Sequence, residues 1–242
     1  MQVLWCLHGN LQQPTAWHDL VQSLKPAHPK LQIQLVDLWE TLHPSSRQYA
    51  RRFCSSVQRS SAANQDRRHY LLGYSLGGRL AWRTLIADPS MWAGAVIVSA
   101  GIGLNNELQK ERCLQRDRIW ANRFLTEPWD ALLAEWDALP VFCGYPCTIP
   151  RPESDFDRQK IATAFEVYSK GHMDDLMPHL QTLSVPITYV TGSDDRRYCQ
   201  LGRTLAQQCP TLTHVQIDNA GHRVPWEQPQ AFTDVLLEML LS

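Results

Sequence analysis

The sequence predicts a doubly wound, mostly parallel α/β sheet of about six strands that carries a helical insertion. Three observations lead to this expectation. Short apolar runs alternate with segments of helical periodicity along most of the 242 residues. The alternation stops between Gly101 and Leu183, where helical patterns follow one another without a strand pattern. One strand pattern runs into a glycine-rich turn and then directly into a helix pattern.

Six short apolar runs are predicted to be strands buried on both faces, as is typical of a parallel sheet covered by helices on both sides. They are residues 3–7, 31–36, 70–73, 93–99, 187–191 and 214–217. Between these runs, patterns with one apolar face predict helices. The predicted helices are residues 16–24, 45–60, 77–87, 199–208 and 228–241.

Residues 1–100 and 184–242 are therefore expected to form the core, and residues 101–183 a helical insertion. Because the insertion follows the fourth strand, its ends meet at the carboxyl edge of the sheet, where ligands of open α/β sheets bind. We expect it to be a lid over that site, with a passive structural insert as the alternative. The insertion contains helical patterns at residues 106–125, 129–136 and 156–170, and a proline-rich bend at residues 140–152.

Charge and composition argue against several classes of function. Lys and Arg number 23 against 24 Asp and Glu, so no broad basic field exists to attract nucleic acid or an anionic membrane. No apolar run approaches the roughly 20 residues of a membrane span. Seven cysteines, an odd number, and a strand pattern directly after Met1 favour a soluble protein in a reducing, cytoplasmic compartment. Cys143 and Cys147 lack a second pair of ligands, so no metal is expected.

A G-x-S-x-G motif, Gly73 to Gly77, lies between a predicted strand and a predicted helix. In this context the small residues allow a sharp turn that exposes the hydroxyl of Ser75 at its tip, as a nucleophile requires. The N–H of Leu76, at the start of the helix, would point to where negative charge develops during the reaction. A plain glycine turn is the alternative.

A serine of this kind needs a base, and the base needs an orienting carboxylate. His222 follows the last predicted strand, and Asp194 and Asp195 follow the strand before it. Either aspartate could orient the histidine; we favour Asp195, the fourth residue of a Gly-x-x-Asp turn. The chain order serine, aspartate, histidine is that of the α/β-hydrolases.

A second oxyanion donor is expected in the loop after the first strand. His8 and Gly9 let the backbone pass close to the serine turn, which leaves the N–H of Asn10 to pair with that of Leu76. We interpret His8 as structural, because His222 already supplies the base.

These motifs and several in the insertion resemble the 2-succinyl-6-hydroxy-2,4-cyclohexadiene-1-carboxylate synthases of menaquinone and phylloquinone biosynthesis, members of the α/β-hydrolase superfamily. The resemblance lies in Gly73–Arg79, Gly101–Leu104, Trp120–Pro128, Trp136 and Leu139–Phe142. It implies a lyase that eliminates pyruvate from 2-succinyl-5-enolpyruvyl-6-hydroxy-3-cyclohexene-1-carboxylate, a small anionic substrate, without a cofactor. The triad would remove a proton, with Ser75 as general base. The N-terminal hairpin usual in this fold is expected to be missing.

The resemblance also implies substrate contacts. Arg79 lies one helical turn after Ser75 and matches the family's carboxylate-binding arginine; an ordinary surface arginine is the alternative. Tyr74 matches an active-site tyrosine, and Trp136 matches an aromatic residue of the lid. In the insertion, Arg112 falls at or beside the family's lid arginine.

Arg112 belongs to a stripe with Arg116, Trp120 and Arg123, which spacings of four, four and three place on one helix face. This stripe is either solvated surface or the roof of an anion site. The chain departs from the family's pattern at Asp137, where tyrosine is common, and near Lys170, where no second lid arginine is found.

Two other functions use the same fold. A carboxylesterase or thioesterase would use Ser75 as a true nucleophile, and a non-catalytic α/β-hydrolase would serve as a ligand receptor. Arg79 and the arginines of the insertion argue against the first, since a neutral ester does not need them. The complete triad argues against the second.

Overall fold

A sheet of six parallel strands forms the centre of the molecule in the computed structural model, which describes residues 1–40, 42–61 and 66–241. The strand order is β2-β1-β3-β4-β5-β6, which confirms the predicted fold class. The strands are β1 (Gln2–Leu7), β2 (Gln32–Val36), β3 (Arg68–Tyr74), β4 (Trp92–Val98), β5 (Ile187–Gly192) and β6 (Leu212–Ile217).

The order of strands reverses direction beside β1. The chain passes from β1 to β2 on one side and then returns to place β3 on the other side of β1, in register from Gln2 opposite Arg68 to Leu7 opposite Gly73. The connections after β1 and β3 therefore leave the carboxyl edge side by side. This reversal is the usual position of a ligand site in an open α/β sheet.

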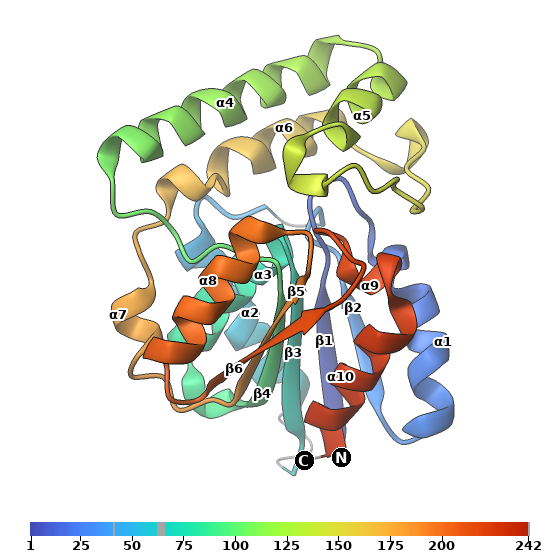
Figure 1. Cartoon of the computed structure of the whole chain (residues 1–242), viewed down its shortest axis with the longest axis vertical. Helices are drawn as coiled ribbons and strands as arrows, with labels where there is room; N and C mark the ends of the chain where they lie inside the picture. The colour runs from blue at the N-terminus through green and yellow to red at the C-terminus, as the bar shows by residue number, and fades with distance from the viewer. Residues whose placement is uncertain (41, 62–65, 242) are drawn as a thin grey trace.

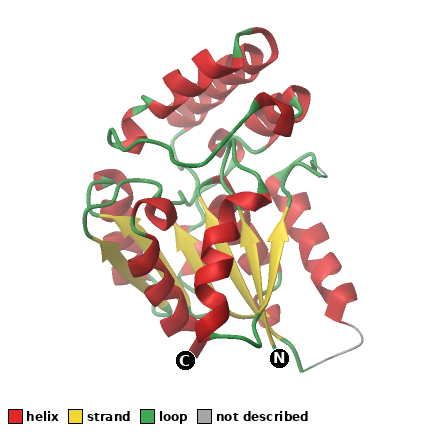
Figure 2. Cartoon of the chain, turned by 90° about the vertical axis from the view of Figure 1, so that its right-hand side faces the viewer, coloured by secondary structure: helices red, strands yellow, loops and turns green. Residues whose placement is uncertain are grey.

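Helices cover both faces of the sheet (Figure 2). Successive strand residues point to opposite faces, so Tyr70 and Leu72 join one buried cluster while Leu71, between them, joins the other. The first cluster packs against α1 (His18–Ala27) and α10 (Pro229–Leu241). The second packs against three other helices, α2 (Ser46–Ser61), α3 (Leu76–Ala87) and α8 (Arg196–Gln208).

The two edge strands depart from the prediction that all six strands are buried on both faces. β3 and β4 are almost wholly buried, but β2 and β6 each contain two exposed residues among buried or half-buried ones. Each edge strand has a neighbouring strand on one side, so part of its surface stays in contact with solvent.

The helices between β4 and β5 lie above the carboxyl edge of the sheet, at the end of the molecule opposite both termini (Figure 1). They are α4 (Glu107–Thr126), α5 (Trp129–Asp137) and α6 (Arg158–Val167). A shorter helix, α7 (Met177–Leu180), lies beside the end of α8 instead, where the Gln181 side chain contacts that of Gln208.

Side-chain caps and aromatic packing explain where these helices begin and how they hold together. Asn106 accepts a hydrogen bond from the N–H of Gln109 at the start of α4, and Asp157 accepts from two backbone N–H groups at the start of α6. Between the helices, the rings of Phe124 and Phe165 stack with centroids 5.5 Å apart. Phe124 and Phe165 belong to the same buried cluster as α2, α3 and α8, so the insertion and the core share apolar packing.

Some helix boundaries differ from the prediction. α8 begins at Arg196, directly after Asp195, whereas the pattern predicted residue 199. α6 ends at Val167, and Ser169 then caps a short turn, so the helix predicted to reach residue 170 is shorter. A four-residue helix, α9 (Val224–Glu227), precedes α10. Within the described ranges, no helix is long and apolar enough to cross a membrane.

Replacement of Phe232 by alanine tests the packing of α10 on the sheet. The Phe232 side chain is fully buried among residues of β1, β3 and β4. We expect Phe232→Ala to lower the free energy of unfolding by about 3–5 kcal/mol, through lost burial and the cavity left behind. The control Leu241→Ala, on the same helix but 68% exposed, should change it by less than about 0.5 kcal/mol. Urea unfolding followed by circular dichroism measures both, and equal effects would contradict the described packing.

Candidate active site

Ser75 lies at the tip of a strained turn between β3 and α3. Its φ of 51° and ψ of −107° are uncommon for a residue with a side chain. Neighbouring glycines allow the turn: a Cβ on Gly73 would meet the Gly77 carbonyl oxygen, and a Cβ on Gly78 would meet Ala100. The Ser75 N–H donates to the Val98 carbonyl at 3.0 Å, which ties the turn to the end of β4.

His222 and Asp195 meet Ser75 from two other loops at the carboxyl edge. The Nε2 atom of His222 lies 3.2 Å from Ser75 Oγ, and its Nδ1 atom lies 2.7 Å from Asp195 Oδ2. Asp195 and His222 are each 3% exposed. Buried in this way, the carboxylate can fix the tautomer of the ring so that Nε2 faces the serine as an acceptor.

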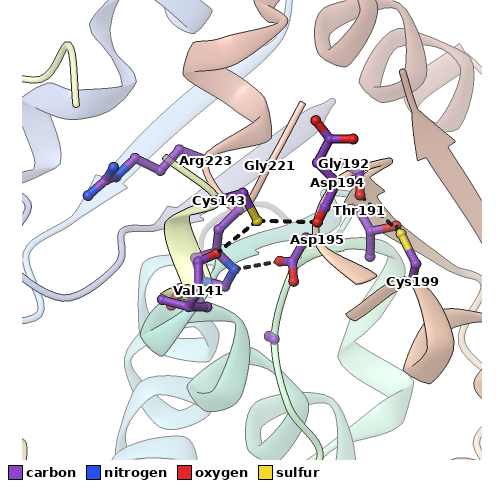
Figure 3. Close-up of polar contacts among 12 residues, drawn as sticks. Val141, Cys143, Thr191, Gly192, Asp194, Asp195, Cys199, Gly221 and Arg223 are labelled. Atoms are coloured by element: carbon purple, nitrogen blue, oxygen red, sulfur yellow. Dashed lines mark hydrogen bonds and ion pairs between the residues drawn. The ribbon is translucent and has the colours of Figure 1, made fainter. Parts of the chain in front are cut away.

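The two aspartates that the sequence left open have different surroundings. Asp195 contacts His222, whereas the carboxylate of Asp194 is exposed and accepts a hydrogen bond from the Tyr145 hydroxyl at 2.8 Å. Figure 3 shows the two carboxylates pointing away from each other. The backbone oxygen of Asp194 lies 3.2 Å from Cys143 Sγ, and burial raises the pKa of that thiol.

A close backbone approach joins the aspartate and histidine loops. A Cβ on Gly192 would collide with the carbonyl oxygens of Ala220 and Gly221. The N–H of Asp194 donates to the Ala220 oxygen at 2.9 Å. Glycine at position 192 therefore lets the loop after β5 touch the loop after β6, which brings Asp195 within reach of His222.

The loop after β1 lies against the serine turn. The N–H of Gly77 donates to the His8 carbonyl at 3.0 Å, so the start of α3 and this loop are joined directly. Leu76 is the first residue of α3, and Asn10 lines the space beside Ser75. The arrangement suits backbone donors directed at one oxygen of a bound molecule.

His8 holds this loop in place. Its Nδ1–H donates to the Gly9 carbonyl at 2.9 Å, and its Nε2 accepts from the N–H of Leu38 at 3.1 Å. Burial lowers the pKa of His8 to about 4, so the neutral ring that this donor and acceptor pattern requires is the stable form at neutral pH.

A cavity of about 250 Å³ opens above Ser75 and His222, between the sheet edge and the insertion. Such a volume suits a small organic molecule. The walls combine aromatic side chains with a few polar ones, and include Trp120, Trp136, Phe142, Phe165, Tyr168 and Tyr198. Trp136, predicted as a substrate contact, lies on this wall with its ring edge-on to Phe165 at 5.4 Å.

Four cationic side chains line the same cavity: Arg79, Arg116, Lys170 and Arg197. Arg79 donates to the Tyr168 carbonyl at 2.6 Å, and its burial lowers its pKa. Arg116 pairs with Asp117 at 2.6 Å. The cavity wall thus holds more cations than carboxylates, as a site for an anionic molecule requires.

The surroundings of Lys170 also perturb its pKa. Burial is the main cause that lowers its pKa to about 8, and the charges of Arg197, Arg79 and Arg116 lower it further, while Cys113 acts in the opposite direction. A lysine in such surroundings gains from a bound anion, because the anion replaces the water that burial removed.

Two predicted substrate contacts do not line this main cavity. Arg112 is exposed and absent from the cavity wall; the arginine of α4 that lines the cavity is Arg116, one turn later. Tyr74 lies under the catalytic edge of the sheet, its ring 5.5 Å from that of His222 and 4.9 Å from that of Trp226. It lines a smaller neighbouring cavity instead, because alternation along β3 turns its side chain toward the α1 and α10 face.

Sequence reasoning missed Lys170 and Arg197. Arg197 follows Asp195 by two residues, so its position just beyond the carboxyl end of β5 was an available signal. Lys170 lies in a short turn after α6, so the helical pattern predicted to reach residue 170 does not give the direction of its side chain. Among the described residues, no group of three or more His, Cys, Asp or Glu side chains is arranged to hold a metal ion.

Comparisons with known proteins agree with this geometry. The family model described as "Alpha/beta hydrolase family" matches residues 6–235. A protein of Serratia proteamaculans named 2-succinyl-6-hydroxy-2,4-cyclohexadiene-1-carboxylate synthase is 31% identical over 99% of this chain and 93% of its own length. A protein of Yersinia pseudotuberculosis with the same name is 31% identical over 98% and 86%.

Solved structures share the fold. MenH from S. aureus superposes with a TM-score of 0.85 at 22% identity, over 99% of this chain and 93% of that one. The carboxylesterase CesB from Bacillus subtilis superposes with a TM-score of 0.67 at 17% identity, over 99% and 83%. The resemblance drawn from the motifs is therefore confirmed: the chain belongs to the alpha/beta hydrolase family, as a relative of the 2-succinyl-6-hydroxy-2,4-cyclohexadiene-1-carboxylate synthases.

Proposed function

We propose that this chain is a lyase of menaquinone biosynthesis that eliminates pyruvate from 2-succinyl-5-enolpyruvyl-6-hydroxy-3-cyclohexene-1-carboxylate. The product is 2-succinyl-6-hydroxy-2,4-cyclohexadiene-1-carboxylate. The observation that carries the proposal is a serine, histidine and aspartate array beneath a small cavity with four cationic side chains on its wall. Full-length similarity to synthases of this name supports the same reaction.

In this reaction Ser75 acts as a general base that His222 activates. His222 takes the hydroxyl proton of Ser75, and the serine oxygen removes a proton from the ring carbon next to the succinyl ketone. The electron pair moves through the ring double bond, and the C–O bond to the enolpyruvyl group breaks. That group leaves as the enolate of pyruvate, which becomes pyruvate by taking up a proton at carbon, and loss of one proton from the His222 imidazolium restores the resting enzyme. No covalent acyl-enzyme is needed.

The backbone amides of Leu76 and Asn10 stabilise the charge that develops on the ketone oxygen. Leu76 begins α3, so its N–H is one of the helix donors without an intrahelical partner, and the helix dipole favours negative charge at this end. The hydrogen bond from Gly77 to His8 keeps the Asn10 loop beside it. Both donors belong to the backbone, so little reorganisation accompanies the reaction.

The cations of the cavity bind the carboxylates of the substrate. We assign this role to Arg79, Arg116, Lys170 and Arg197, with Trp136 as an apolar wall. Lys170 occupies the region where the family's second lid arginine was not found. A neutral ester would gain nothing from this set, which favours the lyase over an esterase.

We further propose that residues 101–183 form a lid over a core of residues 1–100 and 184–242. Helices α4, α5 and α6 lie above Ser75, and their side chains supply much of the cavity wall. Such a lid would exclude water from the developing anion. A cytoplasmic location fits a small-molecule enzyme of this kind.

Pyruvate release tests the proposed reaction. We expect the purified protein to release pyruvate from the enolpyruvyl substrate, and Ser75→Ala and His222→Ala each to lower kcat on the order of 10²- to 10⁴-fold, because each removes the proton transfer. Ser154→Ala, at an exposed serine of the insertion, is the matched control. Hydrolysis of p-nitrophenyl esters without pyruvate release would instead support a carboxylesterase or thioesterase. Saturable binding of the substrate without turnover would support a receptor.

The two neighbouring aspartates provide a second test. Asp195→Asn should lower kcat by roughly 10³- to 10⁴-fold, because an amide no longer fixes the productive tautomer of His222. Asp194→Asn should leave kcat within a few-fold of the wild type, since it alters an exposed contact with Tyr145. Equal losses in the two variants would remove Asp195 from its assigned role.

The pH dependence of substrate binding tests Lys170. Its pKa is about 8 in the free protein, so its positive charge is present below that pH and is lost above it. KM for the anionic substrate should therefore rise as the pH is raised through 8. Lys170→Gln should raise KM at low pH and remove this rise, whereas Lys25→Gln, at an exposed lysine of α1, should keep it. An unchanged pH profile in Lys170→Gln would exclude the contact.

A further inference from the structure

A second, smaller cavity adjoins the main one at Ser75. Its volume of about 20 Å³ is enough for one water-sized group. The two cavities share four wall residues: Asn10, Ser75, Trp136 and Phe142. The remaining wall residues of the smaller cavity are Gln12, Tyr74, Cys147, Arg151 and Arg223. A molecule in the main cavity could therefore extend one small group past Ser75 into this space.

Two buried guanidinium groups on this wall share one carboxylate. Arg151 comes from the insertion, and Arg223 directly follows His222; their side chains are 7% and 4% exposed. Arg151 Nη2 contacts Asp137 Oδ2, and Arg223 Nη2 contacts Asp137 Oδ1. Asp137 itself is 25% exposed. Two buried cations are thus paired with a single, partly solvated anion, which leaves their charge incompletely balanced.

Arg151 has an unused donor. Its Nε atom is buried and has no hydrogen-bond partner among the described residues. An unsatisfied donor on a charged group carries a desolvation cost, so a bound acceptor would stabilise it. The guanidinium of Arg223 lies over the Phe142 ring, 3.6 Å from its centroid, and its Nη1 reaches the Tyr145 carbonyl at 3.4 Å.

The other charged and titratable groups nearby do not occupy the unused donors of the two guanidinium groups. Glu227 accepts the backbone N–H groups of Gly221 and Arg223 rather than a guanidinium N–H, and the charge of Arg223 acts on it, so it offsets part of that positive charge. Burial raises the pKa of Tyr74, which keeps its hydroxyl protonated at neutral pH and able to donate. The small cavity therefore offers several donors to an acceptor with two oxygens.

We propose that Arg151 and Arg223 form a carboxylate subsite in this smaller cavity, next to Ser75. The planar fork of a guanidinium matches a carboxylate group, and one carboxylate oxygen fits the space while the rest of the group lies toward the main cavity. Which molecule carries this carboxylate rests on the proposed function: the group is one carboxylate of the substrate, whose other carboxylates lie against Arg79 and Lys170 in the main cavity. Asp137, which holds both guanidinium groups, competes with that carboxylate for their donors.

Formate, the smallest carboxylate, is the probe that tests the subsite without any turnover. In protein labelled with ¹⁵N-arginine, we expect the Nε–Hε signal of Arg151 to shift saturably as formate is added. The Nε–Hε signal that is missing from the spectrum of the Arg151→Lys variant is assigned to Arg151. Arg223→Gln should weaken formate binding at this signal by about tenfold or more, and Arg203→Gln, at an exposed arginine of α8, should not change it. If formate shifts the Arg79 signal but leaves the Arg151 signal unchanged, the proposed subsite is overturned.

Asp137→Asn separates an anion subsite from a purely structural ion-pair cluster. If Asp137 competes with the ligand, its neutral replacement should tighten formate binding at the Arg151 signal. If the three side chains merely hold the insertion to the histidine loop, the same variant should weaken or abolish formate binding. The second result, obtained with protein whose circular dichroism is unchanged, would overturn the proposal.

Turnover then distinguishes failure of the subsite from failure of the proposed function. Arg151→Gln should raise KM for the enolpyruvyl substrate by about tenfold or more, with a smaller effect on kcat, because a substrate contact is lost. Pyruvate release with an unchanged KM would remove the substrate carboxylate from the subsite and leave the reaction intact. No pyruvate release from the wild type, together with a formate-dependent shift at Arg151, would refute the reaction and keep the anion subsite.

Discussion

The close approach of two backbone turns beside β1 is the constraint on which the site depends. Ser75 is held at φ 51° between β3 and α3, and the N–H of Gly77 reaches the His8 carbonyl. A Cβ on Gly77 would collide with the backbone oxygens of Leu7 and His8. Gly192 allows the equivalent approach between the loops that carry Asp195 and His222. Because both contacts are made by backbone atoms, the relative positions of Ser75, His222 and Asp195 follow from the sheet itself.

Charge is concentrated on one cavity rather than spread over the molecule. The chain carries 23 Lys and Arg against 24 Asp and Glu, yet the cavity above Ser75 is lined by four cations and one carboxylate, that of Asp117. Burial lowers the pKa of Arg79 and Lys170, whereas Arg116 and Arg197 are exposed. Attraction for an anion is therefore local, and water screens it least beside Arg79 and Lys170.

Asp137 connects the insertion with the catalytic loop. Through Arg223, the residue after His222, and Arg151 in the insertion, it joins two parts of the chain that both line the space around Ser75. Phe142 lies in the same contact region, its ring 5.7 Å from His222 and under the Arg223 guanidinium. Tyrosine is common at the position of Asp137 in the family that the chain resembles. A change to aspartate there brings a different set of polar contacts to the edge of the active site.

The sequence by itself determined the order of strands and helices, the turn at Ser75, and the loops that supply Asp195 and His222, because periodicity and turn residues are local properties of the chain. It left open whether Asp194 or Asp195 orients His222. Only the packing of the loops after β5 and β6 brings one of them, Asp195, into contact with His222. The choice of Arg112 instead of Arg116 failed because both lie on one stripe of α4, and the way that helix packs on α6 selects the turn that faces the cavity. The positions of Lys170 and of the cluster of Arg151, Asp137 and Arg223 were decided by tertiary structure alone, since these residues reach the site only when the insertion folds over the sheet edge.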